Sequence, residues 1–194
     1  PMIIKDKVVG DLCIQKYEKN AFDLSDLSTF KILSTYIAIA LDNSSLYKKV
    51  HYNANYDSLT GIYNRRKIIE NINKLKERSD YECENYYIAM MDIDNFKNYN
   101  DVNGHQRGDW LLTRLGEVLM NTVGDLGIVT RYGGEEFAVI LYNQSEDTAL
   151  NLGELISQNI QNTYFIGQEH QPNKHITVSI GVSTYPKVAK TKKE

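Results

Sequence analysis

A glycine pair followed by two glutamates, lying between two β-like segments, constrains the fold of this 194-residue chain more than any other feature. The Gly-Gly-Glu-Glu-Phe motif at residues 133–137 separates residues 128–132 from residues 137–141, and both segments are rich in β-branched and aromatic residues. Such a pair predicts a tight β-hairpin, because the turn needs positive φ and glycine adopts it at little cost. The two carboxylates would then stand at the mouth of the hairpin. Acids at turns are commonly just solvated, so this motif alone does not define a site.

A second group of acids ends an apolar segment. Residues 86–94 read Tyr-Tyr-Ile-Ala-Met-Met-Asp-Ile-Asp, a pattern typical of a buried strand. Asp92 and Asp94 are two residues apart and share one face if the strand stays extended. A carboxylate buried without a partner is unfavourable by several kcal/mol, and a cation would supply the partner. Mg²⁺ binds one or two protein carboxylates together with substrate phosphates, so the acids predict a Mg²⁺ site; the alternative is that they merely cap or solvate the strand end.

A polar segment rich in turn-forming residues, 96–109, follows this strand. Lys97 could contact a phosphate, and Asn100 and Asp109 carry an amide and a carboxylate that can accept hydrogen bonds from the N1–H and N2–H₂ groups of guanine. Asp109 also precedes an amphipathic segment, so it could equally be the N-cap of a helix. Lys97 and Asn100 could likewise be ordinary loop residues.

Four ordered motifs resemble the GGDEF domain of diguanylate cyclases. Residues 57–66 resemble the family's D-x-L-T-G-x-x-N-R-R, residues 92–97 resemble D-I-D-x-F-K, residues 100–109 resemble N-D-x-x-G-H-x-x-G-D, and residues 131–137 resemble R-Y-G-G-[DE]-E-F. A single GGEEF run would be weak support. Four motifs in the family's order, over roughly residues 55–186, form a specific match.

The resemblance implies a diguanylate cyclase, which condenses two GTP molecules into cyclic di-GMP and two pyrophosphates. Each 3′-OH would attack the α-phosphate of the GTP held by a facing second chain, so a homodimer is expected. The implied catalytic residues are Glu135, Asp92 and Lys97. The implied ligands of Mg²⁺ (or Mn²⁺) are Asp92, the Ile93 carbonyl, Glu135 and Glu136. The implied GTP-binding residues are Phe96, Lys97, Asn100, Asp109, Gly133 and Gly134.

The order of elements also predicts the fold class. Helices are expected at about residues 65–78, 108–123 and 148–161, and strands at residues 86–94 and 176–183 in addition to the hairpin. This order predicts an α/β (α+β) domain with a ferredoxin-like antiparallel core and helices on one face. The resemblance implies the same arrangement, a palm-like nucleotidyl-cyclase fold in which both acid groups meet on neighbouring strands.

The N-terminal region is expected to form a separate part. Residues 8–15 predict a strand that pairs with residues 2–4, and a long helix then runs over about residues 23–50 or beyond. This pattern resembles the C-terminal end of a GAF sensor domain. The expected division is therefore a partial GAF domain with its linker helix over residues 1–50 and the GGDEF catalytic domain over residues 51–194.

A seam of mostly apolar residues at heptad positions a and d runs along the expected linker helix. The N-cap of this helix is expected at Asp23 or Ser25. The members of the seam alternate at spacings of three and four: Phe30, Leu33, Ile37, Ala40, Ser44, Tyr47, His51 and Ala54. The seam predicts a dimer stalk that leads into the catalytic domain. For its first half, the alternative is packing against the sensor domain of the same chain.

Composition narrows the function classes. A formal net charge of −3 gives no basic field for nucleic-acid binding, and two cysteines without a C-x-x-C pattern form no disulfide framework. The sequence shows no signal peptide and no apolar run that approaches membrane-spanning length. We therefore expect a cytoplasmic signal-transduction protein with no membrane segment in this chain.

Two departures from the family limit what the resemblance implies. The family's inhibitory product-binding motif R-x-x-D, five residues before the glycine pair, corresponds here to Gly124 and Gly127, so that site is expected to be absent. The chain also stops at Glu194, before the family's last helix and its triphosphate-binding Lys and Arg. The chain as given could therefore be inactive. The remaining alternative is an inactive GGDEF domain that binds GTP or cyclic di-GMP as a regulator, or that serves as a dimerisation module.

Overall fold

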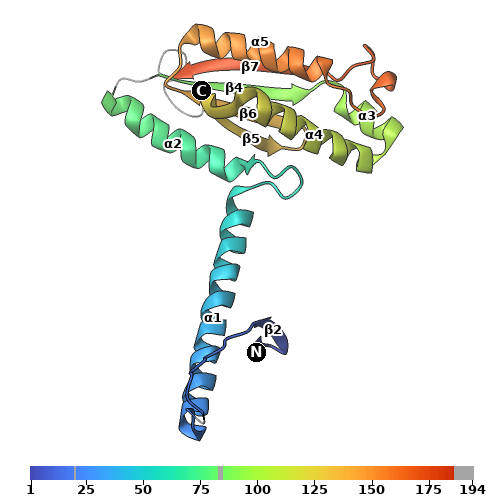
Figure 1. Cartoon of the computed structure of the whole chain (residues 1–194). Coiled ribbons are helices and arrows are strands. Elements are labelled where there is room, and N and C mark those ends of the chain that lie inside the picture. Colours follow the sequence, from blue (N-terminus) through green and yellow to red (C-terminus); the bar gives the residue numbers. More distant parts are fainter. Residues whose placement is uncertain (20, 83–84, 186–194) are drawn as a thin grey trace. The chain divides into compact units, whose positions relative to one another are not determined.

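The structure is a computed structural model that describes residues 1–19, 21–82 and 85–185 (Figure 1). The chain divides into two units, Pro1–Tyr52 and Asn53–Glu194. All of the predicted catalytic, metal-binding and GTP-binding residues belong to the second unit.

A small hairpin opens the first unit. Strands β1 (Met2–Ile4) and β2 (Lys7–Gly10) pair antiparallel, and Lys5 and Asp6 adopt positive φ in the turn between them. The predicted pairing across this turn is confirmed. The predicted strand itself is too long, because β2 ends well before residue 15.

Helix α1 (Leu24–Asn55) begins with a reciprocal cap. The backbone N–H of Asp26 donates to Asp23 Oδ1 at 2.8 Å, and the backbone N–H of Asp23 donates to Asp26 Oδ2 at 3.0 Å. This arrangement satisfies donors that would otherwise be unpaired at the start of the helix, and it confirms Asp23 as the N-cap. The long helix extends past residue 50, as the sequence predicts.

The predicted seam of α1 is largely exposed. Leu33, Ile37 and Tyr47 keep 52%, 39% and 72% of their surface exposed, whereas Ala38, which lies off the seam, is fully buried. Within the described part of the first unit, the seam is therefore not covered. The seam is therefore available for contact with a second chain or with another part of the same protein.

By length and composition, α1 is long and apolar enough to cross a membrane, which the sequence-based expectation of no membrane segment did not foresee. Its longest run without a charged residue is residues 32–41, between Lys31 and Asp42. That run is about half of the roughly 20 apolar residues that a membrane span needs. Length and composition alone do not place α1 in a bilayer.

The second unit is built on a five-stranded sheet in the order β3-β5-β6-β4-β7. Its strands are β3 (Tyr63–Asn64), β4 (Tyr86–Ile93), β5 (Gly127–Gly133), β6 (Glu136–Tyr142) and β7 (Val178–Tyr185). β4 pairs antiparallel with both β6 and β7, β5 pairs antiparallel with β6, and the short β3 pairs parallel with β5. The sheet confirms the predicted mixed α/β (α+β) class with a palm-type core.

Helices cover both faces of this sheet (Figure 1). They are α2 (Arg65–Glu82), α3 (Phe96–Asn103), α4 (His105–Val123) and α5 (Glu146–Asn162), with short 3₁₀ helices at Gly124–Leu126 and Gln168–His170. Leu115 of α4 shares the main core with Val139 of β6, while Ile68 of α2 shares a second core with Ile140. The prediction of helices on one face is therefore wrong. Residues 137–141 are all apolar and buried, and because they point alternately to opposite faces, both faces need cover.

The region between β4 and β5 is more helical than expected. Residues 96–103, expected as a loop, form α3, because Phe96 and Tyr99 lie one turn apart and are both buried. Gly104, with a φ of +85°, then ends α3. As a result α4 begins at His105, three residues before its predicted start.

Candidate active site

The two acid groups meet at one end of the sheet. Asp92, near the end of β4, is the cross-strand partner of Glu136, the first residue of β6. Both side chains are exposed, and neither forms a hydrogen bond or an ion pair with another described residue. Directly opposed side chains lie about 5 Å apart, and like charges at that position are unfavourable unless a cation separates them. The predicted meeting of the two acid groups on neighbouring strands is confirmed.

The oxygen atoms at this end of the sheet suit a hard divalent cation that also binds phosphate oxygens. Asp92 and Glu136 supply carboxylates, and Glu135 in the turn and the main chain of Ile93 are their immediate neighbours. Among residues 1–19, 21–82 and 85–185, no group of three or more His, Cys, Asp or Glu side chains is arranged to hold a metal ion by itself. Mg²⁺ does not require such a group, because it commonly uses one or two carboxylates and completes its shell with water and phosphate oxygens. The residues present therefore fit Mg²⁺ or Mn²⁺ bound together with a nucleotide.

Asp94 has a different role from Asp92. Its carboxylate accepts hydrogen bonds from Thr177 Oγ1 at 2.6 Å and from Ser179 Oγ at 2.7 Å. Its backbone N–H donates to Thr177 O at 3.0 Å. Because hydroxyl groups occupy both carboxylate oxygens, Asp94 ties the end of β4 to β7 and does not stand free beside Asp92.

The hairpin turn lies one residue later than expected. Gly134 and Glu135 are its two turn residues, whereas Gly133 is the last residue of β5 and pairs with Glu136. Gly134 has a φ of +48°, and a Cβ built on it would meet nothing within 4 Å. Glycine is therefore needed here for the backbone conformation, and the open space leaves this backbone accessible to a ligand.

Two of the predicted GTP-binding residues, Phe96 and Lys97, are the first residues of α3. Lys97 is exposed in the first turn of the helix, and its amine forms no ion pair with the side chains that the structure describes. Phe96, beside it, is only 8% exposed and belongs to the core. Any contact between Phe96 and a ligand is therefore limited to its main chain.

The side chains of Asn100 on α3 and Asp109 on α4 form no hydrogen bond or ion pair within the described part of the chain. Asn100 Oδ1 is buried without a hydrogen-bond partner. The Asp109 carboxylate is exposed and has no partner in the described part of the chain. The N-cap of α4 is Gly104, so Asp109 lies inside the helix and the alternative that it is the N-cap is wrong. The Asp109 carboxylate is accessible to a ligand, whereas the Asn100 amide oxygen is shielded from solvent and the fold leaves it without a partner.

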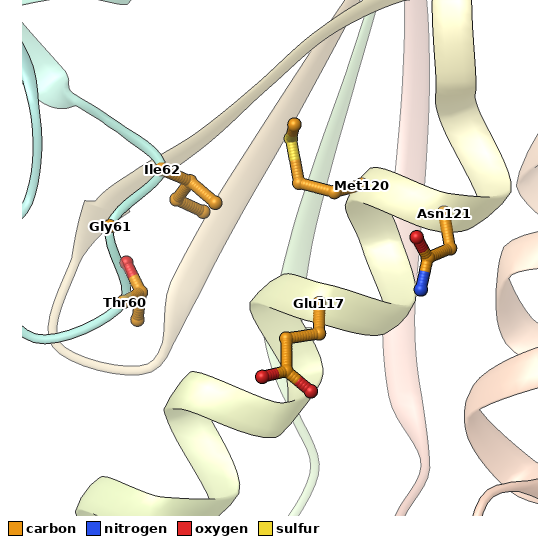
Figure 2. Close-up of a pocket in the computed structure, with 6 residues that line it drawn as sticks. All are labelled: Thr60, Gly61, Ile62, Glu117, Met120 and Asn121. Carbon is orange, nitrogen blue, oxygen red and sulfur yellow. The ribbon is translucent and has the colours of Figure 1, made fainter.

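A surface pocket of about 330 Å³ lies between the turn at residues 60–62 and α4 (Figure 2). It is lined by Thr60, Gly61, Ile62, Glu117, Met120 and Asn121. No cationic side chain lines it, and its one carboxylate, Glu117, pairs with Arg114 at 2.7 Å. The pocket therefore suits neither phosphates nor a metal ion, and the acidic end of the sheet is the better candidate for an active site.

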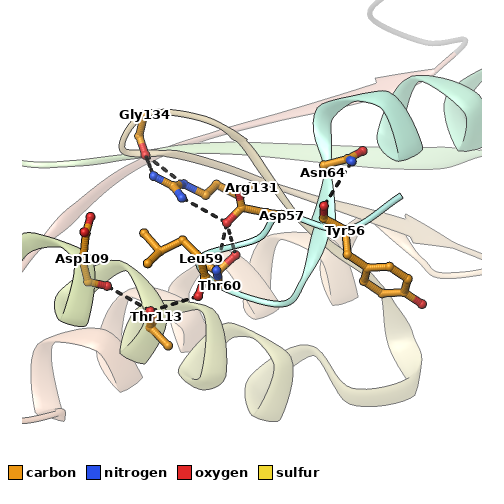
Figure 3. A network of polar contacts seen from close by, with 9 residues as sticks. All are labelled: Tyr56, Asp57, Leu59, Thr60, Asn64, Asp109, Thr113, Arg131 and Gly134. Carbon is orange, nitrogen blue, oxygen red and sulfur yellow. Dashed lines mark hydrogen bonds and ion pairs between the residues drawn. The ribbon is translucent and has the colours of Figure 1, made fainter. Parts of the chain in front are cut away.

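An ion pair links the hairpin to the turn that begins at Asp57 (Figure 3). Arg131 donates to Gly134 O from Nε at 3.0 Å and from Nη2 at 2.8 Å, and its Nη1 donates to Asp57 Oδ1 at 3.0 Å. Asp57 Oδ1 also accepts hydrogen bonds from the backbone N–H and the hydroxyl of Thr60, at 2.9 and 2.7 Å. The side chains of Arg131 and Asp57 are only 14% and 23% exposed. The pair therefore fixes the carbonyl that directly precedes Glu135.

The same turn contacts two further parts of the second unit (Figure 3). Thr113 Oγ1 lies within hydrogen-bond distance of Leu59 O, at 3.3 Å, and of Asp109 O, at 3.0 Å. Asn64 Nδ2 donates to Tyr56 O at 3.3 Å. Through these contacts the turn is tied to the helix that carries Asp109 and to the residues that directly follow α1.

The Asp57 carboxylate gives a testable pH dependence. Burial alone would raise its pKa, but hydrogen bonds from Thr60 and Arg131 hold the pKa below its ordinary value of 3.8. A group whose pKa is lowered by folding stabilises the folded state above its unfolded-state pKa and loses this contribution as the pH falls through its folded-state pKa. We expect the stability difference between wild type and Asp57→Asn in urea unfolding to stay constant above about pH 5 and to shrink below about pH 4. A difference between the two proteins that is independent of pH would contradict this.

The region of this chain that is similar to known proteins contains all of the candidate site residues. The model of the family described as "Diguanylate cyclase, GGDEF domain" matches residues 54–194. The uncharacterized protein YhcK of Bacillus subtilis (strain 168) is 36% identical over 157 residues, which are 80% of this chain and 44% of that protein. An uncharacterized membrane protein of Staphylococcus aureus (strain USA300) is 33% identical over 141 residues, 71% of this chain and 38% of that protein. The match thus spans less than half the length of these curated relatives.

Solved structures share the fold. The coiled coil and GGDEF domain of DgcB from Caulobacter crescentus, in complex with c-di-GMP, is 24% identical, with a TM-score of 0.72 over 81% of this chain and 83% of that chain. The active GGEEF domain of a diguanylate cyclase from Vibrio cholerae is 34% identical, with a TM-score of 0.56 over 62% of this chain and 75% of that chain. The first likeness bears on the fold alone.

Proposed function

Because this chain belongs to the family of GGDEF domains of diguanylate cyclases, we propose that it condenses two GTP molecules into cyclic di-GMP and two pyrophosphates. The register of β4 and β6 carries the proposal, since it sets Asp92 opposite Glu136 beside the open turn at Gly134. The Vibrio cholerae domain, whose GGEEF sequence this chain shares, is described as active, which favours catalysis over a purely structural role.

Asp92, the Ile93 carbonyl, Glu135 and Glu136 would hold Mg²⁺ or Mn²⁺ at this edge. When bound, the cation would supply positive charge that stabilises the negative charge developing on the phosphate oxygens. Lys97, exposed at the start of α3, would neutralise further phosphate charge. Gly133 and Gly134 would let the nucleotide approach the hairpin backbone closely.

The reaction is a phosphoryl-type displacement at the α-phosphate. The 3′-oxygen of one GTP would attack the α-phosphorus of the other, and the bond from that phosphorus to the departing pyrophosphate would break. Glu135, in the turn, would accept the proton of the 3′-hydroxyl. Asn100 and Asp109 would bind the guanine edge, because both carry unused polar groups. Two such displacements close the ring of cyclic di-GMP.

Each active site would need a second copy of the chain, because the attacking hydroxyl belongs to the GTP of the facing domain. The exposed seam of α1 offers one surface for such a homodimer. We further propose that residues 1–50 are the C-terminal part of a GAF sensor domain with its linker helix, and that residues 51–194 belong to the GGDEF catalytic domain. The β1-β2 hairpin followed by one long helix supports this division. A cytoplasmic location follows from the need for GTP.

An assay with GTP and Mg²⁺ tests the proposed reaction. We expect the purified protein to form one cyclic di-GMP for every two pyrophosphates, with a specific activity that rises with protein concentration because two chains must assemble. Metal-dependent GTP binding without product would instead assign the chain as a nucleotide-binding regulator. A failure to bind GTP would leave only a dimerisation module.

Inhibition by product at the family's upstream site is expected to be missing. Neither Gly124 nor Gly127 carries a guanidinium or a carboxylate that could hold a guanine or a phosphate. Gly124 has a φ of +51°, and a Cβ on Gly127 would lie 2.3 Å from Ile140 O, so larger side chains are disfavoured at both positions. The initial rate should therefore be insensitive to added cyclic di-GMP except for competition with GTP. Tight non-competitive inhibition in a product titration would show that another cluster binds the product.

A further inference from the structure

We propose that Gly108 is a specificity-determining residue, because its missing side chain leaves the slot in which the Asn100 amide lies and so fixes how that amide meets the nucleotide base. The inference rests on the proposed use of guanine nucleotides. It concerns a position that carries no polar group of its own and that therefore acts only through Asn100.

The geometry of the slot is set by two helices. Gly108 is buried in the first turns of α4, and Asn100 lies on α3. A Cβ built on Gly108 would lie 1.8 Å from Asn100 Oδ1, 2.9 Å from Cγ and 3.3 Å from Nδ2. The amide oxygen is thus the part of the side chain closest to the backbone of α4, in space that the Cβ of any other residue would fill. One edge of the amide faces the helix, which restricts its plane and its direction.

Helix formation does not favour glycine at this position. Glycine inside a helix is about 1 kcal/mol less favourable than alanine. Gly108 has no positive φ that would require glycine, in contrast to Gly104 before it. The close approach of the Asn100 amide is therefore the feature that accounts for glycine at residue 108.

The position of the slot links it to base recognition. Asp109, the next residue of α4, presents an exposed carboxylate. The Asn100 amide forms no hydrogen bond with any residue that the structure describes, so the slot positions it by shape alone. An amide on α3 and a carboxylate on α4 would thus contact one base together, and Gly108 adjoins both, because it lies against the amide and directly precedes Asp109 in the chain.

Alanine at residue 108 should move the amide without unfolding the protein. The nearest atoms to the added methyl group belong to the end of the Asn100 side chain and not to backbone, so the side chain can rotate away. The higher helix propensity of alanine offsets part of any strain. Gly116→Ala is a matched control on the same helix, because its Cβ would meet Thr60 Cβ at 3.5 Å and Ile62 Cγ2 at 3.6 Å, which are ordinary contacts.

The test measures the affinities for GTP and ATP, by equilibrium titration with Mg²⁺, of wild type, Gly108→Ala, Gly116→Ala, Asn100→Ala and the double variant Gly108→Ala/Asn100→Ala. We expect Gly108→Ala to lose at least about tenfold in the ratio of GTP to ATP affinity, with little change for ATP, and Gly116→Ala to match wild type. In the Asn100→Ala background, Gly108→Ala should not change the ratio of GTP to ATP affinity further, because the amide that it would displace is absent. Thermal unfolding of the same proteins shows whether each variant is folded. The double variant has no steric clash between residues 108 and 100, so its melting temperature should be no lower than that of Asn100→Ala.

Each outcome bears on the inference in a defined way. A wild-type preference for GTP that Gly108→Ala retains would overturn it, as would an equal loss of preference in the Asn100→Ala background. A wild type without any preference for GTP would overturn both the inference and the proposed function. A wild type that binds GTP selectively but forms no cyclic di-GMP would remove the proposed function and leave the role of Gly108 intact.

Discussion

Replacement of Glu135 by glutamine is expected to lower the rate of cyclic di-GMP synthesis by at least about a hundredfold without unfolding the protein. Glu135 is a turn residue whose carboxylate has no hydrogen bond or ion pair within residues 1–19, 21–82 and 85–185. An amide of the same shape therefore leaves the fold unchanged. It removes a negative charge from the proposed site of the divalent cation, and it removes the proposed proton acceptor.

Initial rates with GTP and Mg²⁺, together with melting temperatures, check this result. Glu154→Gln is the matched control, because Glu154 is an exposed glutamate of α5 outside the proposed site, and it should keep wild-type activity. A folded Glu135→Gln protein whose rate stays within about threefold of wild type would remove Glu135 from the reaction.

Replacement of Arg131 by methionine is expected to destabilise the protein by about 2–3 kcal/mol and to reduce activity even where the variant is folded. The substitution leaves the Asp57 carboxylate, only 23% exposed, without its cationic partner. It also removes both hydrogen bonds to Gly134 O, which hold the turn that carries Glu135. The loss of stability and the loss of turnover thus have separate physical causes.

Chemical unfolding and cyclase assays separate these two effects. Arg114→Met removes an arginine from an ion pair with Glu117 whose members are 45% and 54% exposed, so it should cost less than about 1 kcal/mol and spare activity. Adding Asp57→Asn to Arg131→Met should restore part of the stability, because no unpaired carboxylate remains, but should not restore turnover. Equal stabilities of Arg131→Met and Arg114→Met would show that burial of the Asp57–Arg131 pair is unimportant.

The parts of the fold that were predictable are those encoded in local patterns. The hairpin at Gly134 follows from glycine between two β-like segments, and the meeting of Asp92 and Glu136 was expected from the order of elements together with the family resemblance. The α+β class follows from the order of the periodic segments. Each of these features depends on residues within a few positions of one another or on one strand pairing.

The features that were missed depend on distant or competing contacts. Asp57 and Arg131 are 74 positions apart, and nothing in either motif states that they touch. Asp109 resembles an N-cap because an apolar helical pattern follows it, yet the positive φ of Gly104 allows α4 to begin earlier. The second helical layer was missed because an uninterrupted apolar strand such as residues 137–141 does not reveal whether one face or both are covered.

The strand order of the sheet has a consequence for synthesis of the protein in the cell. β4 lies between β6 and β7, and both of these partners come later in the chain, beginning at Glu136 and Val178. The apolar segment Tyr86–Ile93 therefore leaves the ribosome with neither edge paired. At about 5–20 residues per second, the nascent chain needs a few seconds to reach its first partner strand. During that time this segment is exposed to association with other nascent chains, so we expect translation speed between the two strands and chaperone binding to this segment to affect the yield of folded protein.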